Sequence, residues 1–182
     1  MGTLLNRRRY MGGCESQPLP PGYTQLSELS VANDESLWVV TDVPFASGEW
    51  RLVFTAKYYS IKTSQRQLCG WEDDPWFGCD KGKWNFSGTL VSTNIPKNTQ
   101  LAVDTWYDFD MTVTPQTYAS STKLGIFRCN GPNYNRYQSH MSVKSFQAYS
   151  NDVLVGDFVP CKNLDNEKGL YNLVTHVFSK LQ

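Results

Sequence analysis

Residues 50–58 read WRLVFTAKY, and this segment decides the fold class. Large apolar side chains alternate in it with smaller or polar ones. Successive side chains of a β-strand point to opposite faces of its sheet, so such alternation buries one set and leaves the other in solvent. The segment therefore predicts a β-strand with one face in a hydrophobic core.

Two further segments repeat this period of two. Residues 106–114 read WYDFDMTVT, and Pro115 follows with no N–H to donate, which predicts the end of ladder pairing there. Residues 142–149 read SVKSFQAY, and Asn151 and Asp152 supply turn chemistry before the next apolar run. No apolar stripe with the helical period runs longer than about two turns. These patterns predict an all-β fold, either a sandwich or a barrel.

Composition bounds the number of domains and the class of partner. The chain has 182 residues, which is enough for one domain with a core and too few to predict two. Its 17 acidic and 17 basic side chains give a formal net charge of zero, so it lacks the positive charge expected of a nucleic-acid binder. No run approaches the roughly 18 apolar residues of a transmembrane helix, so no membrane partner is predicted.

The C-terminal part of the chain carries the most specific motifs. Residues 155–163 read VGDFVPCKN, and residues 168–174 read KGLYNLV. These segments resemble the closing strands of laminin-G-like (concanavalin A-like) jelly-roll domains, a family found in bacteriophages of gut bacteria and in surface proteins of those bacteria. Weaker similarity to other strands of the family is carried by residues 22–43, 123–128 and 140–149. The resemblance covers most of residues 20–178, departs at Asn172, where Asp is usual, and implies a two-sheet antiparallel jelly-roll sandwich.

The N-terminal segment differs from the rest of the chain. Residues 1–17 show no strand pattern, and the Pro-rich residues 18–22 separate them from the first predicted strand. We therefore divide the chain into an extended N-terminal arm, 1–17, and a jelly-roll domain, 18–182. No apolar segment of about 7–15 residues follows the arginines of the arm, so no secretory signal peptide is predicted.

The arm is predicted to dock on a partner protein. Its candidate docking residues are Arg7, Arg8, Arg9 and Tyr10. Guanidinium groups pair with carboxylates through two parallel hydrogen bonds, so adjacent arginines suit an acidic partner surface. The competing interpretation is a disordered, solvated arm. The arginine run resembles the short N-termini of virion proteins of gut phages, which favours docking.

Five cysteines, an odd number with no CxxC pair, give no zinc signature. Cys69 and Cys79 could face each other across a hairpin that turns at residues 73–75, which would allow a disulfide. A chain without a signal peptide is expected to fold in a reducing cytosol, where disulfides are rare. We therefore predict five thiols, with Cys161 as a small buried hydrophobe in its strand.

Catalysis has little support in the sequence. Some enzymes of the fold that the resemblance implies hydrolyse glucans with carboxylates in an ExDxxE arrangement along one strand. Retaining cleavage needs two carboxyl groups about 5–5.5 Å apart. No segment of the chain has that spacing. Asp108 and Asp110 are predicted to share one sheet face, where a solvated pair is the commoner explanation. We expect a protein that is not an enzyme and has no cofactor or metal, although Asp73, Asp74 and Asp80 leave a calcium site open.

Two segments combine aromatic rings with polar side chains, as glycan-binding surfaces do. The candidate residues are Trp71, Asp73, Asp74 and Trp76 in the segment 69–86, and Tyr134, Arg136 and Tyr137 in the segment 130–137. Aromatic rings stack on the C–H faces of sugars, and carboxylates accept hydrogen bonds from sugar hydroxyls. Alternating aromatic residues in a hairpin more often belong to a core, and we favour that interpretation for the first segment.

The resemblance and the arm together predict a non-enzymatic bacteriophage virion structural protein, made in the cytoplasm of the host bacterium. It would be a capsid decoration, fibre or tail-associated protein that contacts other virion proteins, forms a homo-oligomer and contacts carbohydrate of the host surface. The alternative is a carbohydrate-binding module of a bacterial surface protein, which the lack of a signal-peptide pattern disfavours. Sandwiches of this kind carry many unrelated functions, so the fold alone does not choose between the two.

Overall fold

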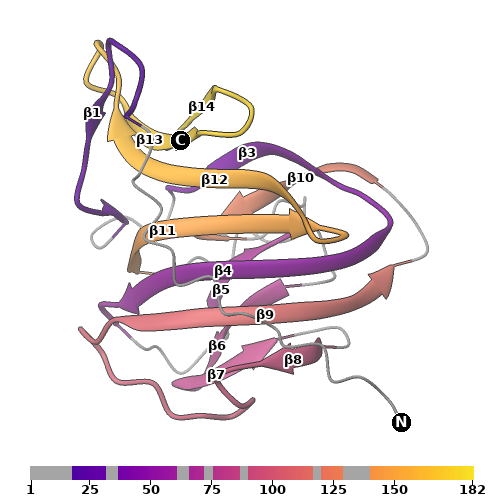
Figure 1. Cartoon of the computed structure of the whole chain (residues 1–182). Helices are drawn as coiled ribbons and strands as arrows, with labels where there is room; N and C mark the ends of the chain where they lie inside the picture. The colour runs from indigo at the N-terminus through magenta and orange to yellow at the C-terminus, as the bar shows by residue number, and fades with distance from the viewer. Residues whose placement is uncertain are drawn as a thin grey trace, which may run out of the picture.

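The computed structural model describes residues 18–31, 37–60, 66–71, 76–86, 90–116, 120–128 and 140–182. In these residues the chain consists of β-strands and their connections and contains no helix, so the predicted all-β class is confirmed. The strands form two antiparallel sheets (Figure 1). No helix in the described residues is long and apolar enough to cross a membrane. The predicted arm, residues 1–17, lies outside them.

The larger sheet has nine strands. Its main path runs β14-β13-β12-β11-β4-β9-β8, with β1 paired to β12 and β2 paired to β11. These strands are β1 (Thr24–Gln25), β2 (Leu29–Ser30), β4 (Gly48–Tyr58), β8 (Leu90–Thr93), β9 (Tyr107–Gln116), β11 (Met141–Ser150), β12 (Val153–Lys162), β13 (Lys168–Asn172) and β14 (Val177–Lys180).

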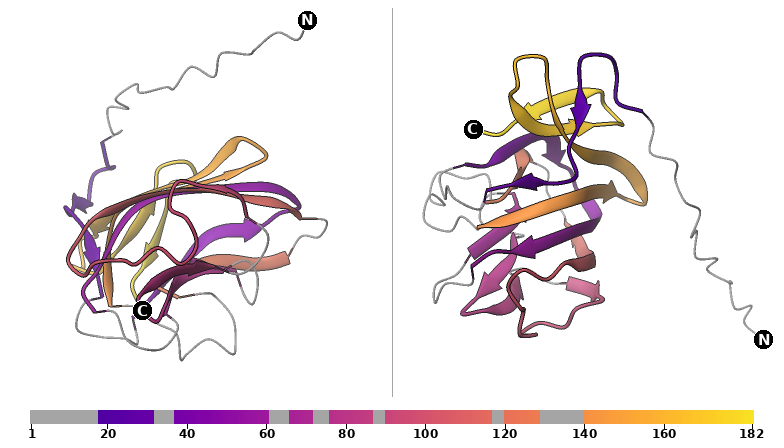
Figure 2. Two further views of the ribbon diagram at one scale, coloured as in Figure 1. Left: turned by 90° about the horizontal axis from the view of Figure 1, so that it is seen from below. Right: turned by 90° about the vertical axis from the view of Figure 1, so that its left-hand side faces the viewer.

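The smaller sheet has five strands in the order β3-β10-β5-β6-β7. They are β3 (Val39–Phe45), β5 (Arg66–Gly70), β6 (Trp76–Asp80), β7 (Lys83–Phe86) and β10 (Ser120–Ile126). The two sheets lie face to face as layers, which the left view of Figure 2 shows from below. The nine-stranded sheet is nearer the viewer in Figure 1. This arrangement is consistent with a β-sandwich.

Strand β4 has the alternation that its sequence predicts. Its buried side chains are Trp50, Leu52, Phe54, Ala56 and Tyr58. Because β4 lies between β9 and β11, the register places Phe54 opposite both Phe109 and Phe146. The Phe54 ring stacks on these two rings, with centroid distances of 4.8 and 4.9 Å. Full burial of each ring contributes about 1.5–3 kcal/mol, so this row is a major part of the core.

Aromatic contacts also join the two sheets. The ring of Trp84 in β7 lies 4.4 Å from that of Phe109 in β9, centroid to centroid. The ring of Trp71, which follows β5, lies 4.6 Å from that of Trp50 in β4. All four side chains are at most 1 % exposed. The core therefore fills the space between the sheets, and the opposite face of the nine-stranded sheet points away from it.

Strand β9 continues through Pro115, so the predicted end of pairing at this residue was wrong. Val113 lies opposite Trp50 and Gln116 lies opposite Gly48, which means that β9 advances one residue more than β4 over this stretch. The register shift includes Pro115, so the residue without an N–H lies where the regular ladder pairing is already interrupted. Pairing then resumes beyond the proline.

The described cysteines are all buried thiols: Cys69, Cys79 and Cys161. The predicted thiol state is confirmed for these three, and the other two cysteines lie outside the described residues. The register of β5 and β6 places Cys69 opposite Phe77 and Cys79 opposite Arg66. The two thiols are therefore not cross-strand neighbours, and the hairpin does not build the disulfide that the sequence allowed.

Candidate functional site

Trp71 lies in the core and not on a surface. This residue is 1 % exposed, and its ring centroid lies 4.6 Å from that of Trp50 and 5.1 Å from that of Phe45. Its indole N–H donates a hydrogen bond of 3.4 Å to the Val43 carbonyl. A sugar ring needs an open aromatic face on which to stack. Trp71 therefore does not offer a glycan-binding surface, and the core interpretation holds for it.

Most of the other predicted site residues lie outside the part of the chain that the structure describes. These are Arg7, Arg8, Arg9, Tyr10, Asp73, Asp74, Tyr134, Arg136 and Tyr137. Trp76 begins β6 and is partly buried. Phe77 and Trp84, from the same aromatic segment, are 0 % exposed, as the core interpretation predicts.

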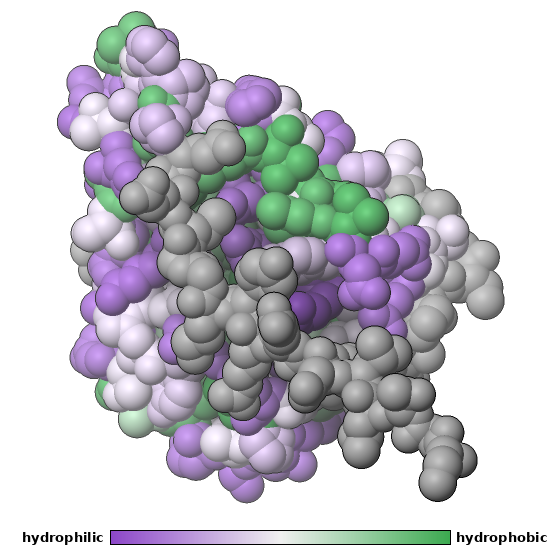
Figure 3. All heavy atoms as spheres, in the orientation of Figure 1, coloured by the Kyte–Doolittle hydropathy of each residue, from purple (hydrophilic) through white to green (hydrophobic). Residues whose placement is uncertain are grey.

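The outer face of the nine-stranded sheet gathers polar and aromatic side chains. We define the outer face as the side of β4, β9, β11 and β12 that is turned away from the smaller sheet. We include Tyr59 and Trp106, which adjoin the ends of β4 and β9. The other members are Arg51, Thr55, Lys57, Asp108, Asp110, Lys144, Ser145, Gln147, Tyr149 and Asp157. Most of the surface drawn in colour on this side is polar, with a hydrophobic patch in its upper half (Figure 3). The outer face is the candidate functional site.

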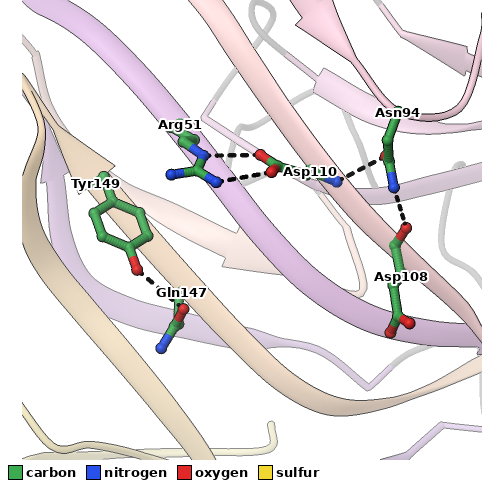
Figure 4. A network of polar contacts seen from close by, with 6 residues as sticks. All are labelled: Arg51, Asn94, Asp108, Asp110, Gln147 and Tyr149. Carbon is green, nitrogen blue, oxygen red and sulfur yellow. Dashed lines mark hydrogen bonds and ion pairs between the residues drawn. The ribbon is translucent and has the colours of Figure 1, made fainter. Parts of the chain in front are cut away.

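An ion pair joins β4 to β9 on the outer face (Figure 4). Arg51 donates from Nε to Asp110 Oδ1 at 2.8 Å and from a terminal nitrogen to Asp110 Oδ2 at 2.7 Å. This hydrogen bonding with Asp110 is the main reason why the pKa of the Arg51 guanidinium is raised. The side chains of the pair are 44 % and 43 % exposed, and an exposed pair adds at most about 1 kcal/mol of stability. Its main effect is therefore to hold both groups in place.

Asn94 extends the hydrogen-bond ladder of β9 beyond the end of β8. Its side-chain amide donates to the Asp108 carbonyl at 2.7 Å and accepts from the Asp110 N–H at 2.9 Å (Figure 4). Its backbone N–H donates to the Asp110 carbonyl at 3.2 Å. These bonds satisfy polar backbone groups at the sheet edge, where an unpaired strand would otherwise face solvent. The backbone that carries both aspartates is thereby fixed.

Hydroxyl and carboxylate groups form a row across three strands. Thr55 Oγ1 in β4 donates to Asp108 Oδ1 in β9 at 2.7 Å, and Ser145 Oγ in β11 donates to Thr55 Oγ1 at 3.4 Å. The register explains the row, because Thr55 lies opposite Asp108 on one side and Ser145 on the other. Opposed residues on one sheet face have Cβ atoms about 4.5–5.5 Å apart, which lets short polar groups meet.

A second row links β11 to β12. Tyr149 Oη donates to Gln147 Oε1 at 3.1 Å (Figure 4), and Gln147 Nε2 donates to Asp157 Oδ1 at 3.2 Å. Gln147 lies opposite Asp157 in the register of the two strands. The Arg51 guanidinium carbon lies 5.6 Å from the centroid of the Tyr149 ring, so this row also meets the ion pair. Ordered polar groups thus extend over four neighbouring strands.

The predicted placement of Asp108 and Asp110 on one sheet face is confirmed. Each carboxylate accepts hydrogen bonds from a neighbouring side chain, and the strands that carry them have a fixed register. Such groups can hydrogen-bond to sugar hydroxyls or to another protein surface. Within the described residues, no cluster of three or more His, Cys, Asp and Glu could hold a metal ion. Two of the three residues considered for calcium, Asp73 and Asp74, lie outside those residues.

The outer face was not among the sites predicted from the sequence. The available signal was the polar character of the outward positions in residues 50–58, 106–114 and 142–149. Alternation shows which side chains of a strand share a face, but it does not show which strands are neighbours. The rows that cross β4, β9, β11 and β12 could therefore not be assembled from the sequence.

Comparisons of the chain with protein-family models, with curated proteins and with solved structures find no match. The resemblance of the C-terminal segments to laminin-G-like domains therefore stays a prediction. The function has to be inferred from that resemblance and from the contacts of the outer face.

Proposed function

We propose that this protein is a non-enzymatic structural protein of a bacteriophage particle, in which a jelly-roll sandwich is docked on other virion proteins by an N-terminal arm. The resemblance of residues 155–163 and 168–174 to jelly-roll domains of gut phages supports the proposal, and the two-sheet antiparallel fold is compatible with it. The protein decorates the capsid or belongs to a fibre or tail, and its outer face contacts carbohydrate of the host surface.

The observation that supports the carbohydrate contact in this proposal is the ordered outer face. Thr55, Asp108 and Gln147 take part in hydrogen-bonded rows that cross four strands, so these groups are in place before a partner arrives. Binding to ordered groups loses less side-chain entropy than binding to free ones. Asp110 is likewise held in place, by two hydrogen bonds from Arg51. These features support a binding surface.

The test is mass spectrometry of purified particles from a lysate of the phage that encodes the chain. We expect peptides of this protein at a copy number stoichiometric with other virion proteins. Washing the particles at high salt before analysis removes host proteins that adhere without docking. Absence of the chain from washed particles would contradict the proposal.

The docking role of the arm has its own test. We expect simultaneous replacement of Arg7, Arg8 and Arg9 by alanine to abolish incorporation into particles, because the variant loses the guanidinium groups that pair with carboxylates of a partner. Circular dichroism checks that the purified variant keeps its β-sheet signal. Normal incorporation of the folded variant would show that the arginines do not dock the protein.

Self-association belongs to the same proposal. Aromatic residues make up 14 % of the chain, and aromatic side chains are enriched at protein interfaces. We expect light scattering of the purified protein to give a multiple of 20.7 kDa at high concentration. A mass equal to the single chain at all concentrations would contradict self-association in solution. It would not contradict assembly on a particle.

The second candidate is a carbohydrate-binding module of a bacterial surface protein. The outer face favours it, because carboxylate, amide and hydroxyl groups lie beside aromatic rings such as Tyr149. The two candidates differ in where the protein is found. A chain that is absent from particles and binds glycans on an array would be such a module.

A further inference from the structure

Four side chains form a basic–aromatic cluster at one end of the outer face: Lys57, Tyr59, Trp106 and Lys144. The Lys57 ammonium lies 4.7 Å from the centroid of the Tyr59 ring and 5.0 Å from that of Trp106. The Lys144 ammonium lies 4.0 Å from the centroid of the same Trp106 ring. Two positive charges from different strands therefore converge on one indole.

A β-bulge in β11 brings Lys144 to this position. Val143 lies opposite Ala56 and Ser145 lies opposite Thr55, so Lys144 is an extra residue of β11 with no counterpart in β4. Both Lys144 and Ser145 are exposed, although regular alternation would place only one of them on the outer face. Bulges re-aim side chains and are frequent beside functional sites. The bulge therefore supplies the cluster with its second cation.

The two lysines of the cluster are not paired with a carboxylate of the described residues. Among the described residues, neither Lys57 nor Lys144 forms an ion pair. Two carboxylates of the outer face and its edge accept hydrogen bonds from hydroxyl groups instead: Asp108 accepts from a threonine at 2.7 Å, and Glu28 accepts from Tyr59 of the cluster at 2.9 Å and from a serine at 3.1 Å. The ring attracts each ammonium group, but the two like charges repel each other, and an anion bound between them would relieve this repulsion.

We propose that the basic–aromatic cluster binds a carboxylated sugar, such as a uronic acid residue of a host surface polysaccharide. This inference rests on the proposed contact between the outer face and host carbohydrate. The sugar carboxylate lies between Lys57 and Lys144, and its hydroxyls bond to the Ser145, Thr55 and Asp108 groups on the same face. An acidic peptide fits less well, because the neighbouring carboxylates would repel closely spaced charges but accept hydrogen bonds from hydroxyls.

The test is isothermal titration calorimetry of the full chain with oligogalacturonate and with its fully methyl-esterified form. The two probes share their rings and hydroxyls and differ in the charge. We expect the acid form to bind at least about tenfold more tightly than the ester and to weaken as salt is added, since salt screens exposed charges. We expect the double variant Lys57→Gln, Lys144→Gln to lose at least about tenfold in affinity for the acid form.

The matched control is Lys97→Gln. Lys97 also places its ammonium over an aromatic ring, 4.9 Å from the centroid of Phe86, but it lies in the connection between β8 and β9. We expect this variant to bind the acid form as the natural chain does. Circular dichroism and the thermal midpoint check that each variant is folded.

Three results would overturn the proposal. They are lack of binding to oligogalacturonate, equal binding of the acid and ester forms, and unchanged affinity of the folded double variant. Tighter binding of polyglutamate than of oligogalacturonate would also overturn it and assign the cluster to acidic peptides. Mass spectrometry of particles does not depend on this cluster, so failure of the sugar site and failure of the virion proposal are distinguishable.

Discussion

Burial changes the acid–base behaviour of several single residues. Cys161 lies in β12, between β1 and β13, and is 0 % exposed. Burial raises the pKa of its thiol from 9.0 to about 11. Burial also raises the pKa of the Cys69 thiol and of the Tyr58 hydroxyl. Unfolding returns these groups to water, where they lose their protons at lower pH than in the folded protein.

We expect folding stability to fall as the pH rises from about 9 to about 11, and Cys161→Ala to reduce this fall. The unfolded thiol releases its proton near pH 9 and the folded thiol near pH 11, so its contribution is complete below the first value and lost toward the second. The difference between the pKa values of the unfolded and the folded thiol corresponds to a loss on the order of 2–3 kcal/mol in the free energy of unfolding.

Urea unfolding at about pH 8 and about pH 10.5 measures the effect. The other buried acids affect the natural chain and Cys161→Ala equally. The difference between the two proteins in how far the free energy of unfolding falls between these pH values therefore isolates Cys161. An equal decline in the natural chain and in Cys161→Ala would contradict the prediction.

Turns and bulges determine how the strands of the larger sheet meet. Ser150 lies opposite Val153, which leaves a two-residue loop between β11 and β12. Both loop residues have positive φ, 51° at Asn151 and 64° at Asp152, as a type I′ turn requires. The predicted turn chemistry at these residues is thus confirmed. Asn151 also reaches a neighbouring element, because its side-chain oxygen accepts from the Glu49 N–H of β4 at 3.0 Å.

We expect Gly48→Ala to lower the free energy of unfolding by about 2–3 kcal/mol, because it combines an unfavourable backbone conformation with loss of a hydrogen bond. Gly48 has φ +107°, and a Cβ there would overlap the side-chain amide of Asn151. The amide would have to move away and give up its bond to β4. Chemical denaturation measures the change.

Gly22→Ala is the matched control for this substitution. Gly22 also has a positive φ, +94°, but a Cβ there would meet Leu164 only at 3.4 Å, an ordinary contact. Gly22→Ala should therefore lower the free energy of unfolding only by the backbone strain, about 1–2 kcal/mol. Equal losses in the two variants would show that the contact between Gly48 and Asn151 has no energetic consequence.

In the whole molecule, the two sheets share one hydrophobic core. Trp84 and Phe109 come from opposite sheets, their ring centroids lie 4.4 Å apart, and both residues are at most 1 % exposed. Neither sheet can keep its buried face away from water without the other, because the buried faces of the two sheets pack against each other. The sheets should therefore form and unfold together.

We expect Trp84→Ala to destabilise the protein by about 3–5 kcal/mol, through lost burial and the cavity that remains. Unfolding followed by tryptophan fluorescence and by far-ultraviolet circular dichroism should give coincident transitions in the variant and in the natural chain. The control is Val153→Ala, at a position 62 % exposed, which should change stability by less than about 0.5 kcal/mol. Separate transitions for the two probes would show that the sheets unfold independently.

Local alternation was sufficient to predict the all-β class and the buried face of β4, and the turn chemistry of Asn151 and Asp152 was sufficient to predict the turn. These features depend on consecutive residues, whose preferences act over one or two positions along the chain. The same pattern placed Asp108 and Asp110 on one face. It also identified the aromatic residues around Trp71 as candidates for a core.

Tertiary packing set the features that join distant parts of the chain. The neighbours of Thr55 across two strands, the bulge at Lys144 and the register shift around Pro115 all depend on how strands pair. Register follows from the fit of the entire core and from turn geometry, because a slip of one residue would turn every buried side chain outward. No short segment contains that information, and so the outer face and its basic–aromatic cluster appeared only once the sheet was assembled.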